Sequence, residues 1–218
     1  MKRDVFISGS SGFMGRKLIG RLLKRGHHVR GLVRFGSEGR LPVGCQPVLG
    51  NALDAASFTE AVRPADTFVH LVGTPHPAPW KEREFRAVDL VSMQASVEAA
   101  RSSGIGHFVY VSVAQPAPVM KAYIRVRSEG EALLRSNGLN ATILRPWYVL
   151  GPGRFWPLAL LPFYWICERL EATKEPAMRL GLVRLDEMVG TLVWAVENPA
   201  SGVRVVDVPA IRNLGRSQ

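Results

Sequence analysis

The chain has 218 residues, 47% of them hydrophobic and 21% charged, and 28 lysines and arginines against 18 aspartates and glutamates give a net charge of +10. This length accommodates one domain with a sizeable core and a small appendage. No apolar run reaches the roughly 18 to 20 residues of a membrane helix, and the N-terminus lacks the pattern of a signal peptide. We therefore expect a soluble cytoplasmic protein. Cys45 and Cys167 have neither disulfide nor metal-site spacing, so reduced thiols and no metal are expected.

The basic residues are scattered through helices and loops, for example in the stretches 16–25 and 81–86. Nucleic-acid binders usually gather such charge in a tail or beside aromatic side chains, and the sequence has neither feature. We therefore expect no nucleic acid. The positive charge is interpreted as a solvated surface that also attracts a phosphorylated cofactor.

The first predicted element is a buried strand at residues 5–8 that runs into Gly9, Gly12 and Gly15, spaced three apart. Gly9 suits a tight turn, Gly12 lets backbone amides approach a ligand, and Gly15 permits close packing of the next helix. That helix stops at Gly26, and its N-terminal amides would face an anionic pyrophosphate. The loop therefore predicts dinucleotide binding, with a ligand-free glycine turn as the alternative. Further contacts in this loop are assigned to Ser11, Phe13 and Met14.

The second predicted strand, residues 28–34, ends at Arg34. In a dinucleotide fold this strand end faces the adenosine ribose, where an acidic residue would bind the free 2′-hydroxyl of NAD. A guanidinium would instead pair with a 2′-phosphate. We therefore expect NADP as the cofactor, with NAD as the alternative.

A short third strand, residues 47–49, is followed by Asn51, Ala52 and Asp54. Asn51 and Ala52 are assigned to the cofactor because a small polar side chain after this strand can reach the adenine edge. Stabilisation of the turn is an equal alternative for Asn51. Asp54 is predicted to be the N-cap of a helix through residues 58 and 62.

The fourth predicted strand, residues 67–72, brings Leu71, Val72 and Gly73 to the crevice at the strand ends, where they would line the ribose. His70 is interpreted as a hydrogen-bonded core histidine, whereas His76 in the next loop could face a substrate. A long helix is predicted over residues 80–102, followed by a fifth strand at 107–113. Helical spacing predicts the buried face of this helix, which comprises Phe85, Val88, Val91, Ala95 and Ala99. Met93 is interpreted as a packing residue of the core.

Several motifs occur together in a fixed order: Gly9-x-x-Gly12-x-x-Gly15, Arg34, the run 50–54, the run 109–112, Tyr123-x-x-x-Arg127 and the run 143–146. In this order the chain resembles the short-chain dehydrogenases/reductases, and more narrowly their atypical, extended-type NAD(P)-binding members. The resemblance implies an α/β fold, a doubly wound and mostly parallel sheet called the Rossmann fold. It covers most of residues 4–208.

The same resemblance implies catalytic residues. Tyr123 matches the family tyrosine, and Arg127 stands where a lysine is expected; positions i and i+4 share one helix face, so the cation can sit beside the phenol. Ser112 is assigned as the orienting hydroxyl, although the family position falls nearest Val113. These departures leave two interpretations, a reductase with altered chemistry or a protein that binds the nucleotide without turnover, such as a redox sensor or assembly factor.

A sixth strand is predicted at 141–149, and the resemblance places Pro146 beside the nicotinamide. Residues 155–170 hold five aromatic side chains, and we expect them to belong to a small substrate lobe at 151–182. Pairing of two copies and weak membrane-surface association are the alternatives for this segment. The chain is predicted to end with a helix at 186–197, a strand at 203–208 and a mobile tail from residue 212. The substrate is expected to be a small apolar molecule, and a homodimer is an open alternative.

Overall fold

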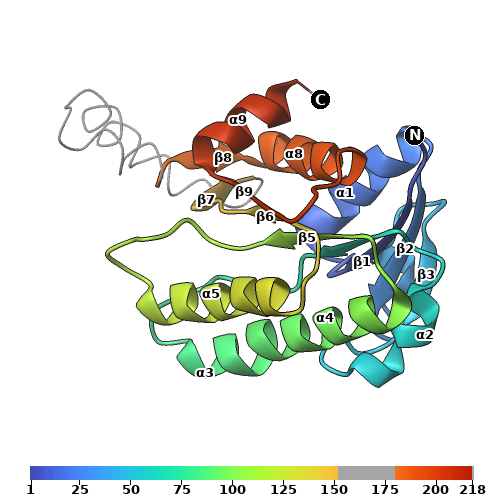
Figure 1. The fold of residues 1–218 in the computed structure, drawn as a ribbon, viewed down its shortest axis with the longest axis horizontal. Coiled ribbons are helices and arrows are strands. Elements are labelled where there is room, and N and C mark those ends of the chain that lie inside the picture. Colours follow the sequence, from blue (N-terminus) through green and yellow to red (C-terminus); the bar gives the residue numbers. More distant parts are fainter. Residues whose placement is uncertain (152–179, 218) are drawn as a thin grey trace.

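The computed structural model describes residues 1–151 and 180–217 (Figure 1). Within these residues, seven strands form one sheet in the order β3-β2-β1-β4-β5-β6-β9, and all neighbouring strands are parallel. The strands are β1 (Asp4–Ser8), β2 (His28–Val33), β3 (Gln46–Leu49), β4 (Thr67–His70), β5 (His107–Val111), β6 (Ala141–Leu144) and β9 (Val203–Val206). This is the doubly wound sheet expected from the alternating strand and helix patterns.

The strand order places the predicted cofactor loop at the centre of the molecule. From β1 the chain builds the sheet outward through β2 and β3, then returns to the other side of β1 and continues through β4, β5 and β6. The register aligns Ile7 of β1 with both Gly31 and Val69. Ligands of open α/β sheets bind beyond the carboxyl ends of the strands at this point of reversal. The glycine loop after β1 lies there.

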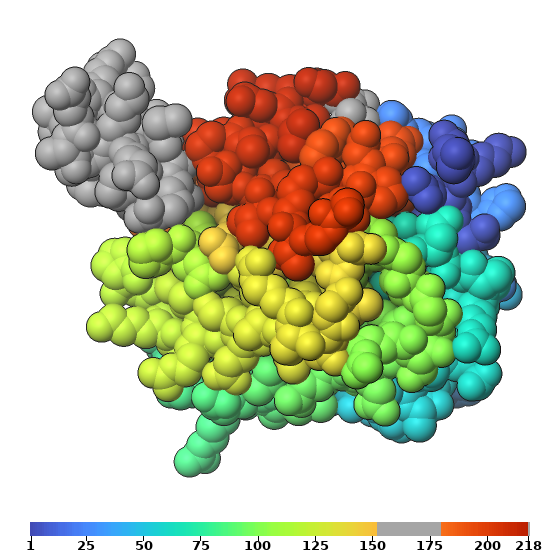
Figure 2. Space-filling view, in the orientation of Figure 1, coloured from blue at the N-terminus to red at the C-terminus, as the bar shows by residue number. Residues whose placement is uncertain are grey.

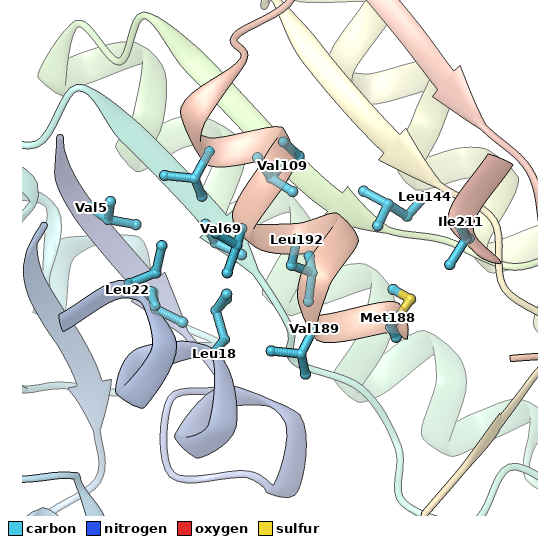
Figure 3. Packing of buried hydrophobic residues seen from close by; sticks show 14 of the residues in the cluster. Val5, Leu18, Leu22, Val69, Val109, Leu144, Met188, Val189, Leu192 and Ile211 are labelled. Atoms are coloured by element: carbon cyan, nitrogen blue, oxygen red, sulfur yellow. The ribbon is translucent and has the colours of Figure 1, made fainter. Parts of the chain in front are cut away.

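Helices cover both faces of the sheet (Figure 1). One face carries α1 (Phe13–Lys24), α8 (Leu185–Glu197) and α9 (Val208–Arg216), and the other carries α2 (Thr59–Val62), α4 (Val91–Ser103) and α5 (Lys121–Ser136). Figure 3 shows the first face, where Leu18 and Leu22 of α1 and Val189 and Leu192 of α8 pack over the sheet. On the opposite face Phe6, Phe68 and Phe108 come from three adjacent strands, with ring centroids 5.1 Å apart for each successive pair. The alternation of side chains along each strand supplies both cores.

The long helix predicted over residues 80–102 is interrupted. It consists of α3 (Glu82–Glu84), a π-helical segment η3 (Phe85–Leu90) and α4. A π-helical turn takes up more residues than an α-turn and therefore rotates the faces that follow. As a result Asp89 is buried, whereas Val88 and Val91, which were expected in the core, are only half-buried.

Three other expectations need correction. The strand predicted at 141–149 is two strands, because Pro146 separates β6 from β7 (Tyr148–Leu150), which pairs with β8 (Leu182–Arg184) in a second, two-stranded sheet. The helix after Asp54 is a short 3₁₀ helix, η2 (Ala55–Ser57), followed by α2. The tail from residue 212 belongs to α9, whose Ile211 is fully buried.

The substrate lobe predicted at 151–182 lies mostly outside the described residues, and so do the aromatic run 155–170 and Cys167. Cys45 is free and half-buried, and burial raises the pKa of its thiol to about 11. Such a thiol is protonated at neutral pH, as expected for a structural cysteine. In the described part of the chain, no helix is long and apolar enough to cross a membrane.

Candidate cofactor and active site

The glycine loop has the conformation expected from its spacing. Gly9 has a φ of +77°, and a Cβ there would lie 2.7 Å from the backbone carbon of Leu71. A Cβ at Gly15 would lie 2.5 Å from the carbonyl oxygen of Gly9, so α1 packs directly on the loop. Both positions therefore require glycine, the first for its backbone conformation and for space, the second for space alone.

The N-terminus of α1 is open to an anionic ligand. Gly12 is the N-cap residue and supplies no capping side chain, and the first turn has no acidic residue. The amides of Phe13 and Met14, which belong to this first turn, are consequently among the donors that an α-helix leaves unpaired. Together with the positive end of the helix dipole, they fit a phosphate group.

Ser10 holds this loop against the neighbouring strand. Its side chain is fully buried, and its Oγ donates a hydrogen bond of 2.6 Å to the carbonyl oxygen of Leu32 in β2. Sequence reasoning missed Ser10, because the glycines around it carry the motif. Ser11, the adjacent residue, is half-buried and remains assigned to the cofactor as a prediction.

Arg34 lies on the surface directly after β2, and Phe35 beside it is 90% exposed. No side-chain hydrogen bond or ion pair engages the Arg34 guanidinium among the described residues. The first acidic residue after β2 is Glu38, in the 3₁₀ helix η1 (Glu38–Arg40). The end of β2 therefore presents a cation where NAD-binding sites commonly place a carboxylate.

Asn51 stabilises the turn after β3. Its Oδ1 accepts a hydrogen bond of 3.1 Å from the backbone amide of Leu53, and its own backbone amide donates to Ser57 Oγ. The turn alternative is thus observed, and contact of Asn51 or the half-buried Ala52 with adenine stays a prediction. Asp54 Oδ1 accepts from the backbone amide of Ala56, which confirms the predicted N-cap.

The end of β4 brings Leu71, Val72 and Gly73 to the same edge as the glycine loop. All three are half-buried, and the backbone amide of Leu71 donates to the carbonyl oxygen of Ser8 at 3.0 Å. Gly73 leaves space for the guanidinium of Arg127, with which a Cβ at this position would collide. These positions agree with the predicted lining of the crevice, while their contact with a cofactor stays a prediction.

Only one of the two ring nitrogens of His70 has hydrogen-bond partners in the described part of the chain. Its Nδ1 lies 3.0 Å from Ser8 Oγ and 2.9 Å from Ser96 Oγ, but its Nε2 is buried without a hydrogen-bond partner among the described residues. Burial, with a smaller contribution from the Arg127 charge, lowers the pKa of His70 to about 3. The ring is therefore neutral throughout the physiological range.

A buried ion pair beside the crevice holds several elements together. Arg127 of α5 donates from Nη2 to Asp89 Oδ1 at 2.6 Å and from Nη1 to the carbonyl oxygen of Val111 at 3.0 Å. Asp89 Oδ2 accepts from both the backbone amide and the hydroxyl of Thr74, at 3.0 and 2.6 Å. The network connects η3, α5 and the loop after β4.

The charge of Arg127 is held firmly in this network. Burial lowers the pKa of its guanidinium, but Tyr123, Tyr110 and Asp89 raise it by more, so the net pKa shift is upward. Burial raises the pKa of Tyr110 to about 12, with Arg127 opposing this shift. Arg127 therefore stays positively charged, but two of its three guanidinium nitrogens already donate hydrogen bonds to Val111 and Asp89.

Tyr123 and Arg127 come together as the i and i+4 spacing predicts. The guanidinium carbon of Arg127 lies 5.1 Å from the centroid of the Tyr123 ring, and the Phe85 ring contacts the same tyrosine at 4.9 Å. Tyr123 is half-buried, so part of its side chain can meet a ligand. The arginine contacts the ring while its charge is directed to Asp89.

Ser112 lies in a different cluster. Its Oγ donates to Glu131 Oε1 at 2.7 Å, and the same carboxylate accepts from Gln115 Nε2 and from Nε and Nη2 of Arg145. Glu131 stands one helical turn beyond Arg127 on α5. The Ser112 hydroxyl is therefore committed to Glu131, and no hydrogen bond joins it to Tyr123 among the described residues.

Pro146 links the ends of β5 and β6. It is buried, and its carbonyl oxygen accepts a hydrogen bond of 2.9 Å from the backbone amide of Ala114. Arg145, directly before it, is fixed by the buried Glu131. Pro146 thus occupies a defined position at the carboxyl edge of the sheet, and its place beside a nicotinamide stays a prediction.

Sequence reasoning missed Asp89 and Glu131, the two buried carboxylates that organise this edge. Both occur in amphipathic helices, where an acidic residue on a solvent face is the ordinary interpretation. The only local signal was their place among apolar residues, and the π-helical segment concealed that signal for Asp89. No group of three or more candidate metal ligands occurs in the described part of the chain.

Residues 9–152 match the model of a family described as NAD(P)H-binding. The matched range includes the glycine loop, Arg34, Asp89, Tyr123, Arg127 and Pro146. It therefore covers nearly all positions assigned above to the cofactor and to catalysis.

Two curated relatives match over most of the chain. A ceramide reductase of Caulobacter vibrioides is 26% identical over 217 residues, which covers 97% of this chain and 66% of that protein. A 3-diazoavenalumate denitrifying reductase of a Streptomyces species is 29% identical over 231 residues, covering 91% of this chain and 73% of that protein. The chain thus spans just under two thirds of the first relative and somewhat more of the second.

Among solved structures, the Bordetella bronchiseptica enzyme WbmH in complex with NAD⁺ has the same fold. The TM-score is 0.71, with 22% sequence identity and coverage of 100% of this chain and 80% of WbmH. The likeness extends over the whole sheet and its helices.

Proposed function

Because the chain belongs to the NAD(P)H-binding family, we propose that it is an NADP(H)-dependent oxidoreductase that transfers hydride between the nicotinamide and a carbonyl-type group of an apolar substrate. The observation that carries this proposal is the glycine loop at the point where the sheet order reverses, with an uncapped helix N-terminus behind it. Dinucleotides are bound in this place in doubly wound folds.

The residues present fit such a cofactor. The loop from Gly9 to Gly15 and the first turn of α1 would hold the pyrophosphate, because a Cβ at Gly9 or Gly15 cannot be accommodated and the helix N-terminus is free of acidic side chains. The loop of Leu71, Val72 and Gly73 would line the ribose. When bound, the cofactor would supply or accept the hydride.

Preference for NADP over NAD rests on Arg34. Its guanidinium is exposed and unpaired in the described structure, at the strand end that faces the adenosine ribose in this fold. A planar guanidinium can bind a phosphate through two parallel hydrogen bonds. Arg34 would therefore recognise the 2′-phosphate.

Tyr123 would act as the acid in reduction, donating its phenolic proton to the substrate oxygen as hydride arrives at the carbon. Arg127, in contact with the ring, would hold the tyrosine in position. Ser112 would have no direct part unless the β5 loop rearranged, because its hydroxyl is bonded to Glu131. A water would then orient the substrate oxygen.

Support for an apolar substrate comes from composition and from a relative. Residues 155–170 are rich in aromatic and aliphatic side chains and lie in the stretch assigned to the substrate lobe. The Caulobacter relative is named for reduction of ceramide, a lipid. We infer that this chain acts on an apolar carbonyl compound.

A second candidate, a nucleotide-binding sensor or assembly factor without turnover, is favoured by one specific observation. Arg127 is committed to Asp89 and Val111, so it differs from a free cation that could hold the ribose and activate the tyrosine. In this candidate the same loop would bind NADP(H), and the ion pair would serve only to hold the edge of the sheet together.

Oxidation of NADPH in the presence of a panel of apolar aldehydes and ketones separates the two candidates. We expect turnover by the wild-type protein and a loss of about 100-fold or more in Tyr123→Phe, with NADPH affinity unchanged. Full turnover in Tyr123→Phe would contradict the role of the phenol. Tight NADPH binding without turnover of any compound would favour the sensor.

A further inference from the structure

Two exposed apolar side chains lie just before two helices at the substrate end of the molecule. Trp80 is 83% exposed and precedes α3 by two residues, and Val119 is 53% exposed and precedes α5 by two residues. Burying such side chains in an apolar environment would be favourable, so each of them could anchor the protein to an apolar surface. We call residues 75–81 and 115–121, with the first turn of α5, the loop rim.

The two parts of the loop rim are neighbours in space. The ring of Phe85, just after α3, contacts that of Tyr123 near the start of α5 at 4.9 Å, and Arg86 and Glu129 form an ion pair of 3.4 Å between the same elements. Figure 1 and Figure 2 show the starts of α3 and α5 at the same end of the molecule. The segments that follow Trp80 and Val119 therefore lie side by side at this end of the molecule.

A basic pocket adjoins this surface. It has a volume of about 510 Å³, with apolar walls from Pro116, Ala117 and Ile124 and cationic groups from Lys121, Arg125 and Arg145. Near the pocket, Lys81 pairs with Glu84 and Arg86 with Glu129, and Arg145 of the pocket itself pairs with Glu131.

Lys121 and Arg125 supply the unbalanced charge of this pocket. Both are exposed and have no side-chain partner among the described residues. Arg145 binds Glu131 through Nε and Nη2, so its Nη1 remains unpaired within the described chain. The pocket suits a phosphate group attached to an apolar or glycerol-like body.

We propose that the loop rim docks on an anionic membrane surface. Trp80 and Val119 enter the boundary between headgroups and acyl chains, and the pocket of Lys121, Arg125 and Arg145 receives the phosphate of an anionic phospholipid. Tryptophan beside basic side chains is typical of proteins that lie in this interface, and the net charge of +10 adds attraction at longer range.

Docking in this way places the carboxyl ends of β4 and β5 against the bilayer, because the loop rim is built from the connections that follow these strands. An apolar substrate dissolved in the membrane then reaches the crevice without crossing water. This consequence rests on the proposed function, whereas the docking itself does not.

Co-sedimentation with vesicles tests the proposal. We expect the purified protein to bind vesicles of phosphatidylcholine with phosphatidylglycerol, to bind pure phosphatidylcholine vesicles far less, and to dissociate as salt increases. Lys121→Gln together with Arg125→Gln should weaken binding roughly 25-fold, since each basic residue near an anionic surface contributes about fivefold. The matched control is Lys2→Gln with Lys24→Gln, an equal charge change at the amino edge of the sheet, where both lysines are exposed.

The apolar contacts have their own control. Trp80→Ser or Val119→Ser should weaken vesicle binding, by about tenfold for the tryptophan. Val43→Ser, which changes a fully exposed valine before β3, should not. The fluorescence difference between the wild type and Trp80→Phe should be quenched by brominated lipids, which reports entry of Trp80 into the bilayer.

Equal binding to neutral and anionic vesicles would overturn the proposed membrane docking. Equal weakening of vesicle binding by the control pair Lys2→Gln and Lys24→Gln would overturn it as well. Binding of soluble glycerol phosphate as tight as binding of vesicles would instead indicate a site for a free phosphate ester. Docking is measured without NADPH. A failure to bind NADPH would therefore contradict the proposed function and leave the docking result standing.

Discussion

Arg127 and Asp89 depend on one another because each is a buried charge. Their side chains are 7% and 1% exposed, and the carboxylate also accepts two hydrogen bonds from Thr74. Removing one member of such a pair leaves the other charge without compensation in a medium of low polarity. The pair therefore fixes the geometry around Tyr123 whether or not the protein is catalytic.

We predict that Asp89→Asn lowers the free energy of unfolding by about 3–5 kcal/mol, because Arg127 loses its counterion. Urea unfolding followed by circular dichroism measures this loss. The control Asp186→Asn affects an ion-paired carboxylate that is 72% exposed, and it should cost less than about 1 kcal/mol. Equal and small effects of the two variants would show that the Asp89 charge is not buried as described.

His70 makes the stability depend on pH. Its pKa is about 3 in the folded protein against 6.5 for a free side chain, mainly because of burial. Between these values the unfolded chain binds a proton that the folded protein does not, so the free energy of unfolding falls as the pH is lowered. His107 has a pKa of about 4 for the same principal reason and acts in the same direction.

We therefore predict that stability decreases from pH 6.5 towards about 3, and that His70→Gln makes this decrease shallower. Urea unfolding at a series of pH values gives the slope of the unfolding free energy against pH. This slope is the quantity to compare, even if the variant is less stable overall. His107→Gln should also make the decrease shallower, because burial lowers the pKa of His107 as well. An unchanged slope in His70→Gln would contradict the assigned burial.

At the scale of elements, the glycine loop and α1 pack tightly against one another in the predicted cofactor site. Gly15→Ala places a methyl group 2.5 Å from the Gly9 carbonyl oxygen, whereas a Cβ at Gly20, five residues further along the same helix, meets no atom within 4 Å. Both glycines lie in α1, so they have the same helical backbone and differ only in the space around the added methyl group.

We predict opposite effects of alanine at these positions. Gly20→Ala should stabilise the protein by up to about 1 kcal/mol through helix propensity, and Gly15→Ala should destabilise it by about 1–3 kcal/mol through overpacking. Thermal unfolding measures both, and NADPH titration should show weaker binding for Gly15→Ala only. Stabilisation by both substitutions would mean that the loop can move away from α1.

Elements were predictable wherever local pattern decides them. The glycine loop, α1, α8 and the strands of the large sheet follow from apolar periodicity and glycine placement. The strands begin within a residue of the expected positions, but several end earlier than expected, β6 most of all. The π-helical segment was not predictable, because nothing local distinguishes Asp89 from a solvent-facing carboxylate. The tail was expected to be mobile because it is terminal and polar, but Ile211 and Gly215 pack on α8 and order it as α9.

For the whole molecule, the sequence predicted the parallel sheet and the family, and the comparisons confirm both. The arrangement of charges could not be predicted, because Arg127 finds Asp89 and Arg145 finds Glu131 only after separate helices pack. The predicted pairing of Tyr123 with Arg127 is present, and Ser112 lies apart from it. The sequence motif therefore identifies the candidate catalytic residues, but the partners of Arg127 and Ser112 depend on how distant segments pack together.

The molecule as a whole is organised around one predicted ligand, so calorimetric titration with NADPH and NADH is the most direct test. We predict tighter binding of NADPH, and a loss of about tenfold or more in Arg34→Ala that spares NADH, because a charge-assisted bond to the 2′-phosphate is removed. Arg40→Ala, at a nearby exposed arginine, should leave both affinities unchanged. Binding of neither nucleotide, or preference for NADH that Arg34→Ala does not alter, would contradict the account.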